Sequence, residues 1–386
     1  MVPSDAPLDA PLDARPDPGR GGRLGRALPD RPQLLSPPTR PSAPTRRWTA
    51  RQPGLGLAGL LLVVPVAVLL AVGAGGPEPS ALVLGPLVTF GLPAVVMVAF
   101  WWEDWPGSSL RPGWSGLVDT VLVAAAAILL TVLGQAVVGT VDVGAVVDPS
   151  PGAGRLPTFP WTLPLGGAVF IAMLQVTFVC ERRPLARLPR VAGGAIALAL
   201  SWLAAVAAYL LLLEVHGPPG SGLDPQTGPL TGGEFGSLLV LVGVWQVWFF
   251  VVWRGWPFAQ GPSPWQRILL GNVVVLGGGV VTYIVARGPA GVPESALTAV
   301  GGCSIAAGLL IGVLFEGWPR SRAAVAAVVL ALTALLAAVL GWYAGTLELS
   351  RATAADWVAH AGLNAIGLSV ILHVAIGRRW PFPAVP

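Results

Sequence analysis

LFEGWP, residues 314–319, closes one of the most apolar stretches of this chain. Similar letters close other apolar stretches, namely WWEDWP (101–106), VVWRGWP (251–257) and GRRWP (377–381), with CERRP (180–184) as a degraded copy. Proline stops a helix because it has no backbone N–H to donate, and tryptophan favours the interface between membrane and water. The motif therefore predicts that helix after helix ends at one membrane surface.

The spacing of the motif indicates an internal repeat. Pro257, Pro319 and Pro381 lie 62 residues apart each time, and the motif follows every second apolar stretch. We therefore expect five copies of a two-helix hairpin. Both signs of charge occur two residues before the tryptophan, as at Glu316 and Arg378, which favours a helix stop over a shared cytoplasmic binding surface.

Length and composition predict an all-α polytopic membrane protein. Hydrophobic residues make up 54% of the chain and charged residues 11%, and there are 16 Trp. Runs of about 20 apolar residues, each long enough to cross the hydrocarbon core, recur from residue 55 onward. We expect about ten transmembrane helices, at 55–75, 81–101, 116–139, 163–180, 191–213, 235–253, 268–286, 295–315, 323–345 and 356–377.

Residues 1–53 differ from the rest of the chain, which forms a transmembrane domain over 54–386. This segment is rich in Pro and Arg and has no apolar periodicity, so it is predicted to be a disordered cytoplasmic tail. The positive charge of the chain lies in this tail and in short loops instead of on a folded face. Nucleic acid is therefore not an expected partner.

Arginine counts predict the orientation. The tail side of the ten spans carries 20 Arg and the opposite side three, Arg155, Arg287 and Arg351. The positive-inside rule then places both termini in the cytoplasm, and we expect a multi-pass protein of a bacterial plasma membrane.

Small residues predict close helix contacts. Ser304, Gly308 and Gly312 recur every fourth residue on one helix face, which is the arrangement that lets backbones approach in lipid. The triplet GGG at 277–279 predicts either another close approach or a kink.

Ionisable residues far from both interfaces would indicate a functional site, and the sequence has none that is clearly central. Asp119, His360 and His373 lie within about two turns of a helix end, where we expect local hydrogen bonds. His360 and His373 are 13 residues apart on one helix and cannot share one metal ion. No phosphate loop, zinc motif or nucleophile elbow occurs, so we expect no catalytic residue, cofactor or metal site.

One group of polar residues is a candidate site. Gln175, Gln246, Asn272 and His373 lie at a similar depth inside the cytoplasmic boundary. They could line a cavity open to the cytoplasm, or they could form hydrogen bonds that hold helices together. We favour the second interpretation. No proton-coupling carboxylate accompanies these residues, which argues against an ordinary proton-driven transporter and leaves passive or partner-driven transport open.

These observations favour a non-enzymatic integral membrane protein with a structural, accessory or partner-binding role, whose partners are the lipid bilayer and an unidentified membrane protein. A small-molecule transporter or channel is the alternative, and a polytopic enzyme or sensor is a third class.

Overall fold

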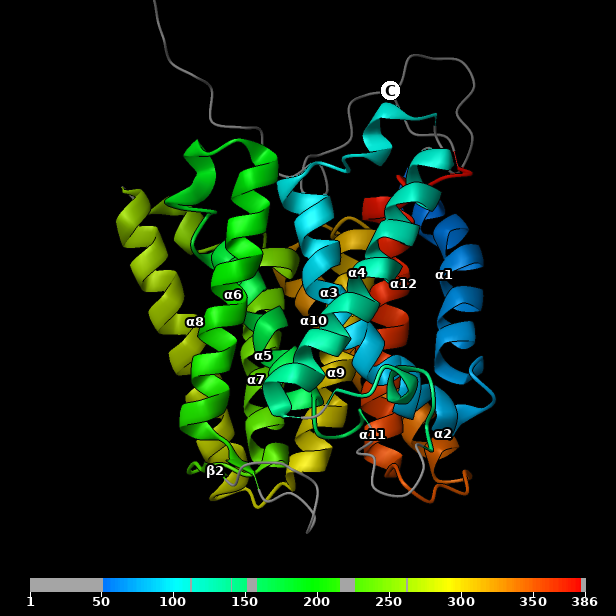
Figure 1. Ribbon diagram of the computed structural model, residues 1–386. Helices are drawn as coiled ribbons and strands as arrows, with labels where there is room; N and C mark the ends of the chain where they lie inside the picture. Colours follow the sequence, from blue (N-terminus) through cyan, green and yellow to red (C-terminus); the bar gives the residue numbers. More distant parts are fainter. Residues whose placement is uncertain are drawn as a thin grey trace, which may run out of the picture.

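The fold was analysed in a computed structural model, which describes residues 51–111, 113–139, 141–150, 158–215, 226–261 and 263–382. The predicted tail lies outside these residues except for its last three positions. Among the described residues, nine helices are long and apolar enough to cross a membrane. The remaining predicted span, 163–180, forms the helix Leu163–Val179, which at 17 residues is ~26 Å long. The chain thus has the architecture expected of an all-α polytopic membrane protein (Figure 1).

The ten helices fall close to the predicted spans. Five are regular: α1 (Gly54–Val72), α4 (Trp114–Val138), α6 (Arg190–Leu212), α8 (Pro264–Arg287) and α10 (Arg322–Ala344). Four begin as α-helix and end as π-helix: α2, η3, α3 and η4 (Pro77–Pro79, Ser80–Leu84, Gly85–Val96, Met97–Trp101), α5 and η7 (Leu163–Leu174, Gln175–Val179), α7 and η9 (Gly232–Gln246, Val247–Val252), and α9 and η11 (Glu294–Leu309, Leu310–Leu314). The last comprises α11, η12, α12 and η13 (Ala354–Ala359, His360–Gly367, Leu368–Ile371, Leu372–Ile376).

Only short elements connect the helices in the described part of the chain. Single 3-10 turns are η5 (Gly107–Ser109), η6 (Gly144–Val146), η8 (Leu185–Arg187) and η10 (Phe258–Gln260). The strands β1 (Glu214–Val215) and β2 (Gln226–Thr227) pair antiparallel over two residues.

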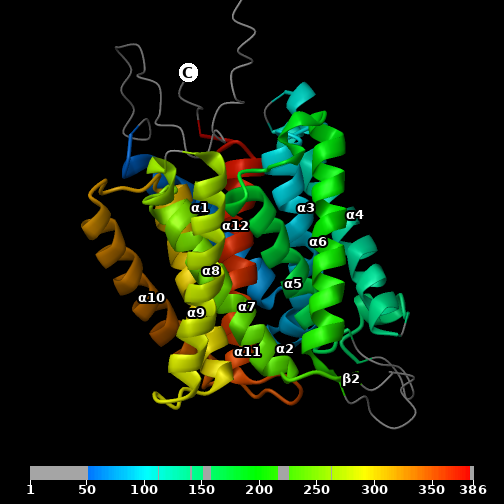
Figure 2. The ribbon, with the colours of Figure 1, turned by 90° about the vertical axis from the view of Figure 1, so that its left-hand side faces the viewer.

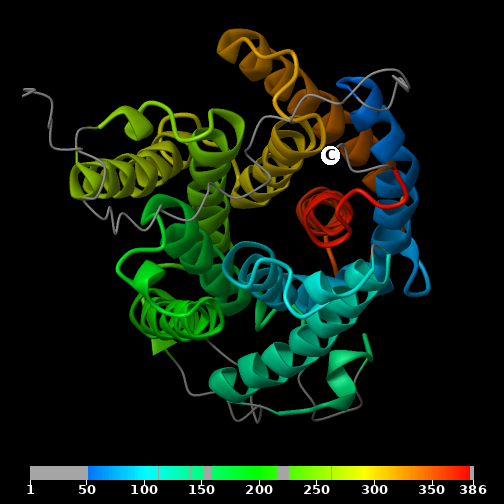
Figure 3. The same cartoon turned by 90° about the horizontal axis from the view of Figure 1, so that it is seen from above.

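The helices form an inner and an outer layer. In the inner layer α3, α5, α7, α9 and the last helix contact one another in this order, and η12, α12 and η13 return to α3 and η4 to close a ring. The outer helices α1, α4, α6, α8 and α10 bury only 17% to 33% of their apolar windows. Seen along the helix axes, α8 and α10 lie at the periphery (Figure 3), and the side view shows α10 leaning away from the body (Figure 2).

Each outer helix packs mainly against the inner helix that precedes it in the chain. The pairs are α3 with α4, α5 with α6, α7 with α8 and α9 with α10, and α1 packs against η12 of the last helix. The two helices of each predicted hairpin contact each other less. The tightly packed pairs are therefore the ones joined through the tryptophan-proline motif.

The five motifs adopt one local structure, which we call the WP turn (97–106, 175–184, 248–257, 310–319 and 372–381). In each, the first residue accepts the N–H of the sixth at 2.6–3.0 Å, and the second accepts the N–H of the eighth at 2.7–3.0 Å. The seventh and eighth residues have φ between 48° and 82°. The left-handed backbone satisfies the last helical carbonyls and reverses the chain before the proline. We call this end of the bundle the WP end and the opposite end the far end.

Arginines in the WP turns bind the ends of neighbouring helices. The Arg182 guanidinium donates to the Phe100 carbonyl at 2.7 Å, and Arg379 donates to the Val313 carbonyl at 3.0 Å. Phe100 and Val313 are each the fourth residue of a WP turn, so the two arginines make equivalent contacts. Burial lowers the pKa of both guanidinium groups.

Small residues mark the close helix contacts. A Cβ at Gly308 would lie 2.6 Å from Val247, and the Ser304 hydroxyl accepts a hydrogen bond from Trp248 at 3.1 Å, so this stripe packs on α7 and η9. A Cβ at Gly278 would lie 2.5 Å from the Trp245 ring. Since α8 runs unbroken through 277–279, the GGG triplet serves a close approach and not a kink.

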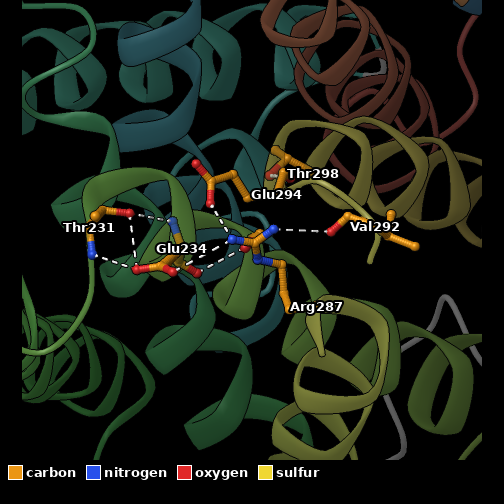
Figure 4. A network of polar contacts seen from close by, with 7 residues as sticks. Thr231, Glu234, Arg287, Val292, Glu294 and Thr298 are labelled. Atoms are coloured by element: carbon orange, nitrogen blue, oxygen red, sulfur yellow. Dashed lines mark hydrogen bonds and ion pairs between the residues drawn. The ribbon is translucent and has the colours of Figure 1, made fainter. Parts of the chain in front are cut away.

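A network around Arg287 holds helix ends together at the far end (Figure 4). The Arg287 guanidinium, at the end of α8, lies 3.7 Å from Glu234 and 3.4 Å from Glu294, in the first turns of α7 and α9. Glu234 also completes a capping box with Thr231. Acidic residues near helix N-termini complement the helix dipole, so this network fixes where α7 and α9 begin.

Candidate functional site: an axial cavity

Three of the four residues proposed as a site form one chain of amide hydrogen bonds. Gln246 Nε2 donates to Gln175 Oε1 at 2.6 Å and to the Ile171 carbonyl at 3.1 Å. Gln175 Nε2 donates to Asn272 Oδ1 at 2.9 Å. Asn272 Nδ2 donates in turn to the Ile268 carbonyl at 2.8 Å. These amides connect the helices of the α5, α7 and α8 regions, and most of their donors and acceptors bond to one another or to a backbone carbonyl.

The fourth residue, His373, does not join this chain. It lies on η13 with 8% of its surface exposed, and its ring meets Phe382 edge to face at 6.0 Å between centroids. A Cβ at Gly59 would lie 3.1 Å from His373 Nε2, so the imidazole lies against α1. Three of the four residues at this depth therefore lie together, and the fourth lies on another face of the inner ring.

A cavity lies on the axis of the inner ring. Its lining comes from all five inner helices and from no outer helix. The centre of a water-sized sphere can occupy about 60 Å³ of it. Its lining side chains are apolar with the single exception of Gln246.

The lining residues recur every fourth position. Two of the stripes are Leu92, Val96 and Phe100 from α3 and η4, and Phe170, Leu174 and Phe178 from α5 and η7. Eight residues correspond to ~12 Å along a helix, and the stripes end at the WP turns. The cavity is thus a narrow apolar slot that runs along the ring axis in the half next to the WP end.

Gln246 has an unusual position at the wall of this slot. Its side chain is 1% exposed, and its Oε1 has no hydrogen-bond partner. The amide orientation follows from its contacts, because Gln175 Oε1 and the Ile171 carbonyl are both acceptors and require the NH2 group on their side. A buried, unpaired carbonyl oxygen costs about 1–3 kcal/mol, and this oxygen is itself enclosed by protein atoms.

A second buried polar cluster lies between α1, α3 and η12, and sequence reasoning identified only its histidine. His360 is 4% exposed, and its Nε2 lies 3.0 Å from the Leu70 carbonyl, which requires the proton on Nε2. Asn364 donates to the Gly85 carbonyl at 3.2 Å and to the Thr89 hydroxyl at 3.3 Å. His360 therefore has one partner on another helix, Leu70, and one local partner, because Asn364 Nδ2 lies 3.5 Å from His360 Nδ1 on the same helix. The signal available in the sequence was an amide four residues after a histidine on one helix face.

Asp119 binds the backbone directly after the first WP turn. Its carboxyl group is fully buried at the start of α4, and Oδ1 accepts the Gly107 N–H at 2.9 Å. Nearby, burial raises the pKa of Asp104 to about 6, against the opposing effect of the Arg378 guanidinium. These groups lie at the WP end, outside the axial cavity.

A second cavity, of about 420 Å³, lies at the far end beside Asp148, Phe159 and Arg351. Residues 151–157, which precede Phe159, are outside the described part of the chain. Within the described residues, no three His, Cys, Asp or Glu side chains gather as metal ligands would.

Comparisons with protein-family models, with curated proteins and with solved structures give no match. The class of the protein therefore rests on its own residues: a membrane-spanning helical bundle with an inner ring, an outer layer and one axial slot.

Proposed function

We propose that this chain is a non-enzymatic integral membrane protein with a structural, accessory or partner-binding role, and not a path for solutes. The proposal rests on the hydrogen bonds that the amide side chains make. Gln175 and Asn272 spend their polar groups on hydrogen bonds between helices, and only Gln246 reaches the axial cavity. An apolar slot of this width stays dry, and a dry constriction opposes the passage of ions and polar solutes.

The proposal includes the arrangement of the chain in the membrane. The matched backbone bonds of the five WP turns and the spacing of 62 residues support five two-helix repeats. The arginine excess on the WP side supports a cytoplasmic location for both termini. The lipid bilayer of a bacterial plasma membrane, and a membrane protein partner, are the proposed surroundings.

A transporter is the second candidate, because an axial cavity shared by five helices is also the place where a translocation path would run. Flux measurements separate the two. The purified chain is reconstituted into liposomes, and the movement of protons, monovalent ions and small neutral solutes is compared with that in protein-free liposomes. We expect no difference.

A matched variant makes this test decisive. Leu309→Trp adds bulk to the cavity wall, whereas Gly277→Ala changes a site with nothing within 4 Å of the new methyl group. Solute flux through the wild-type chain that Leu309→Trp abolishes and Gly277→Ala preserves would replace the accessory role with a transport role.

A further inference from the structure

We propose that three arginines at the WP end bind the headgroup of an anionic phospholipid that carries one phosphate and no ammonium group, such as phosphatidylglycerol. Arg254 belongs to the third WP turn, Arg320 directly follows the fourth, and Arg322 begins α10. The inference deepens the proposed role, because it rests on the lipid bilayer as a partner and names the class of lipid.

The three arginines lie where the third and fourth WP turns meet. The Arg254 guanidinium lies 3.2 Å from the place that a Cβ at Gly317 would occupy, and the Arg320 N–H donates to the Gly317 carbonyl at 2.8 Å. The Arg322 guanidinium lies over the ring of Trp256, in the third WP turn, at 4.8 Å from its centroid. All three arginines are exposed, so an anion can reach this surface from outside the bundle.

The acidic side chains of the WP turns are already paired with other arginines. These ion pairs are Glu103–Arg190, Asp104–Arg378, Glu181–Arg267 and Glu316–Arg379, at 2.8–3.6 Å. Among the described residues, no carboxylate forms an ion pair with Arg254, Arg320 or Arg322. Three positive charges therefore stand together without a counter-ion from the described part of the protein.

Indole rings lead from these arginines toward the membrane interior. Trp256 meets Trp253 edge to face at 5.8 Å between centroids, and Trp253 meets Trp248 in the same way at 5.7 Å. All three rings are partly exposed, and Trp248 lies in η9, within the membrane-spanning helix. The surface is thus basic at the interface and apolar below it. A lipid with an anionic headgroup and an acyl chain matches both parts, whereas a free anion would use only the first.

The missing carboxylate selects the kind of headgroup. A guanidinium group binds a phosphate through paired hydrogen bonds, so the arginines suit any phospholipid phosphate. The ammonium group of phosphatidylethanolamine would then lie among arginines with no acid to receive it. The glycerol of phosphatidylglycerol is neutral and avoids this repulsion.

The inference can be tested by native mass spectrometry of the full chain in detergent. Phosphatidylglycerol and phosphatidylethanolamine with identical acyl chains are added in equal amounts, and the ratio of the two bound lipids is measured. The wild-type chain should retain phosphatidylglycerol with a preference of about tenfold or more. The double variant Arg320→Gln/Arg322→Gln should lower the ratio by about tenfold or more, because each arginine near an anionic lipid contributes about fivefold.

Matched variants separate this site from general attraction. Arg187→Gln removes an exposed arginine of η8, also at the WP end and without an ion-pair partner among the described residues, and it should leave the ratio unchanged. The double variant Arg320→Lys/Arg322→Lys keeps the charge and should keep most of the preference. A photoreactive phosphatidylglycerol should label peptides that contain Trp253 or the first turns of α10 in the wild-type chain.

Each outcome decides the inference separately from the flux test. Equal retention of the two lipids, or an equal loss of preference in Arg187→Gln and the double glutamine variant, overturns it. Displacement of the lipid by millimolar inorganic phosphate would assign the arginines to a soluble anion and would also overturn it. Solute flux together with the expected lipid preference retains the lipid site and overturns only the proposed role.

Discussion

The side chains of Arg378 and Asp104 form an ion pair with 3.1 Å between Nε and Oδ2, although the two residues lie 274 positions apart. The contact joins the last WP turn to the first. It shows at the level of single atoms that the inner ring of helices closes on itself.

The Arg378–Asp104 pair should make stability depend on pH. Burial, with smaller contributions from Asp119 and Glu103, raises the pKa of Asp104 from 3.8 to about 6 in the folded chain. The folded state therefore favours the protonated acid, and this stabilisation is complete below pH 3.8 and is lost as the pH rises through about 6. In thermal melts of the detergent-solubilised chain, Asp104→Asn should remove this part of the decline between pH 4 and 7.

A second variant checks the sign. The Arg378 guanidinium lowers the pKa of Asp104, so Arg378→Gln should move the inflection to a higher pH. Wild-type and Asp104→Asn profiles that run parallel across this pH range would contradict the assignment.

Adjacent arginines should differ in their contributions to stability. The Arg379 side chain is 13% exposed, lies 3.0 Å from Glu316 and donates to the Val313 carbonyl. Arg379→Ala leaves a partly buried carboxylate and helix-end carbonyls without a partner, at a cost of about 2–4 kcal/mol. The Arg378 side chain is 40% exposed but its partner Asp104 only 15%, so at neutral pH Arg378→Ala should cost about 1–2 kcal/mol, less than Arg379→Ala because the helix-end carbonyls keep their partner. Denaturant titration of both variants gives the order, and the reverse order would refute this account of the WP turns.

Neighbouring glycines in the GGG triplet should respond in opposite ways to alanine. Gly278→Ala places a methyl group 2.5 Å from the Trp245 ring and should lower the free energy of unfolding by about 1–3 kcal/mol. Gly277→Ala meets nothing within 4 Å and should be neutral or stabilising by up to about 1 kcal/mol, the difference in helix propensity. Thermal melts of the two variants suffice, and equal effects would show that α8 does not pack on α7 as described.

The proposed orientation predicts which loops a membrane-impermeant thiol reagent can reach. Ala290 is exposed at the far end and Ser109 at the WP end. In a chain with Cys180 and Cys303 replaced by alanine, Ala290→Cys should react in intact cells, and Ser109→Cys should react only after the membrane is opened. The opposite pattern would invert the topology.

The sequence predicts the boundaries of the helices well because the responsible forces are local. Apolar length sets each span, and the tryptophan-proline motif marks where a helix ends, so the predicted ends at residues 101, 253 and 315 lie within one residue of the structure. The sequence also holds a local signal for the left-handed residues of the WP turn, because Gly255 and Gly317 occupy the second of these positions in two copies.

The rotation of each helix could not be predicted in the same way. Residues at one depth can face any neighbour, and rotation decides that Gln175 reaches Gln246 and Asn272 while His373 lies against α1. The pairing of α1 with η12 was likewise hidden, because it depends on ring closure across most of the chain. A single sequence carries no local signal for either arrangement.

The contact between α1 and η12 has a consequence for biogenesis. Helices enter the bilayer in the order in which the ribosome makes them, and α1 is the first membrane-spanning segment of the described chain while its main partner is the last. It must wait in lipid while the other spans are synthesised. Its apolar window has a mean hydropathy of 2.8, equalled among the described helices only by α10, which suits prolonged contact with hydrocarbon.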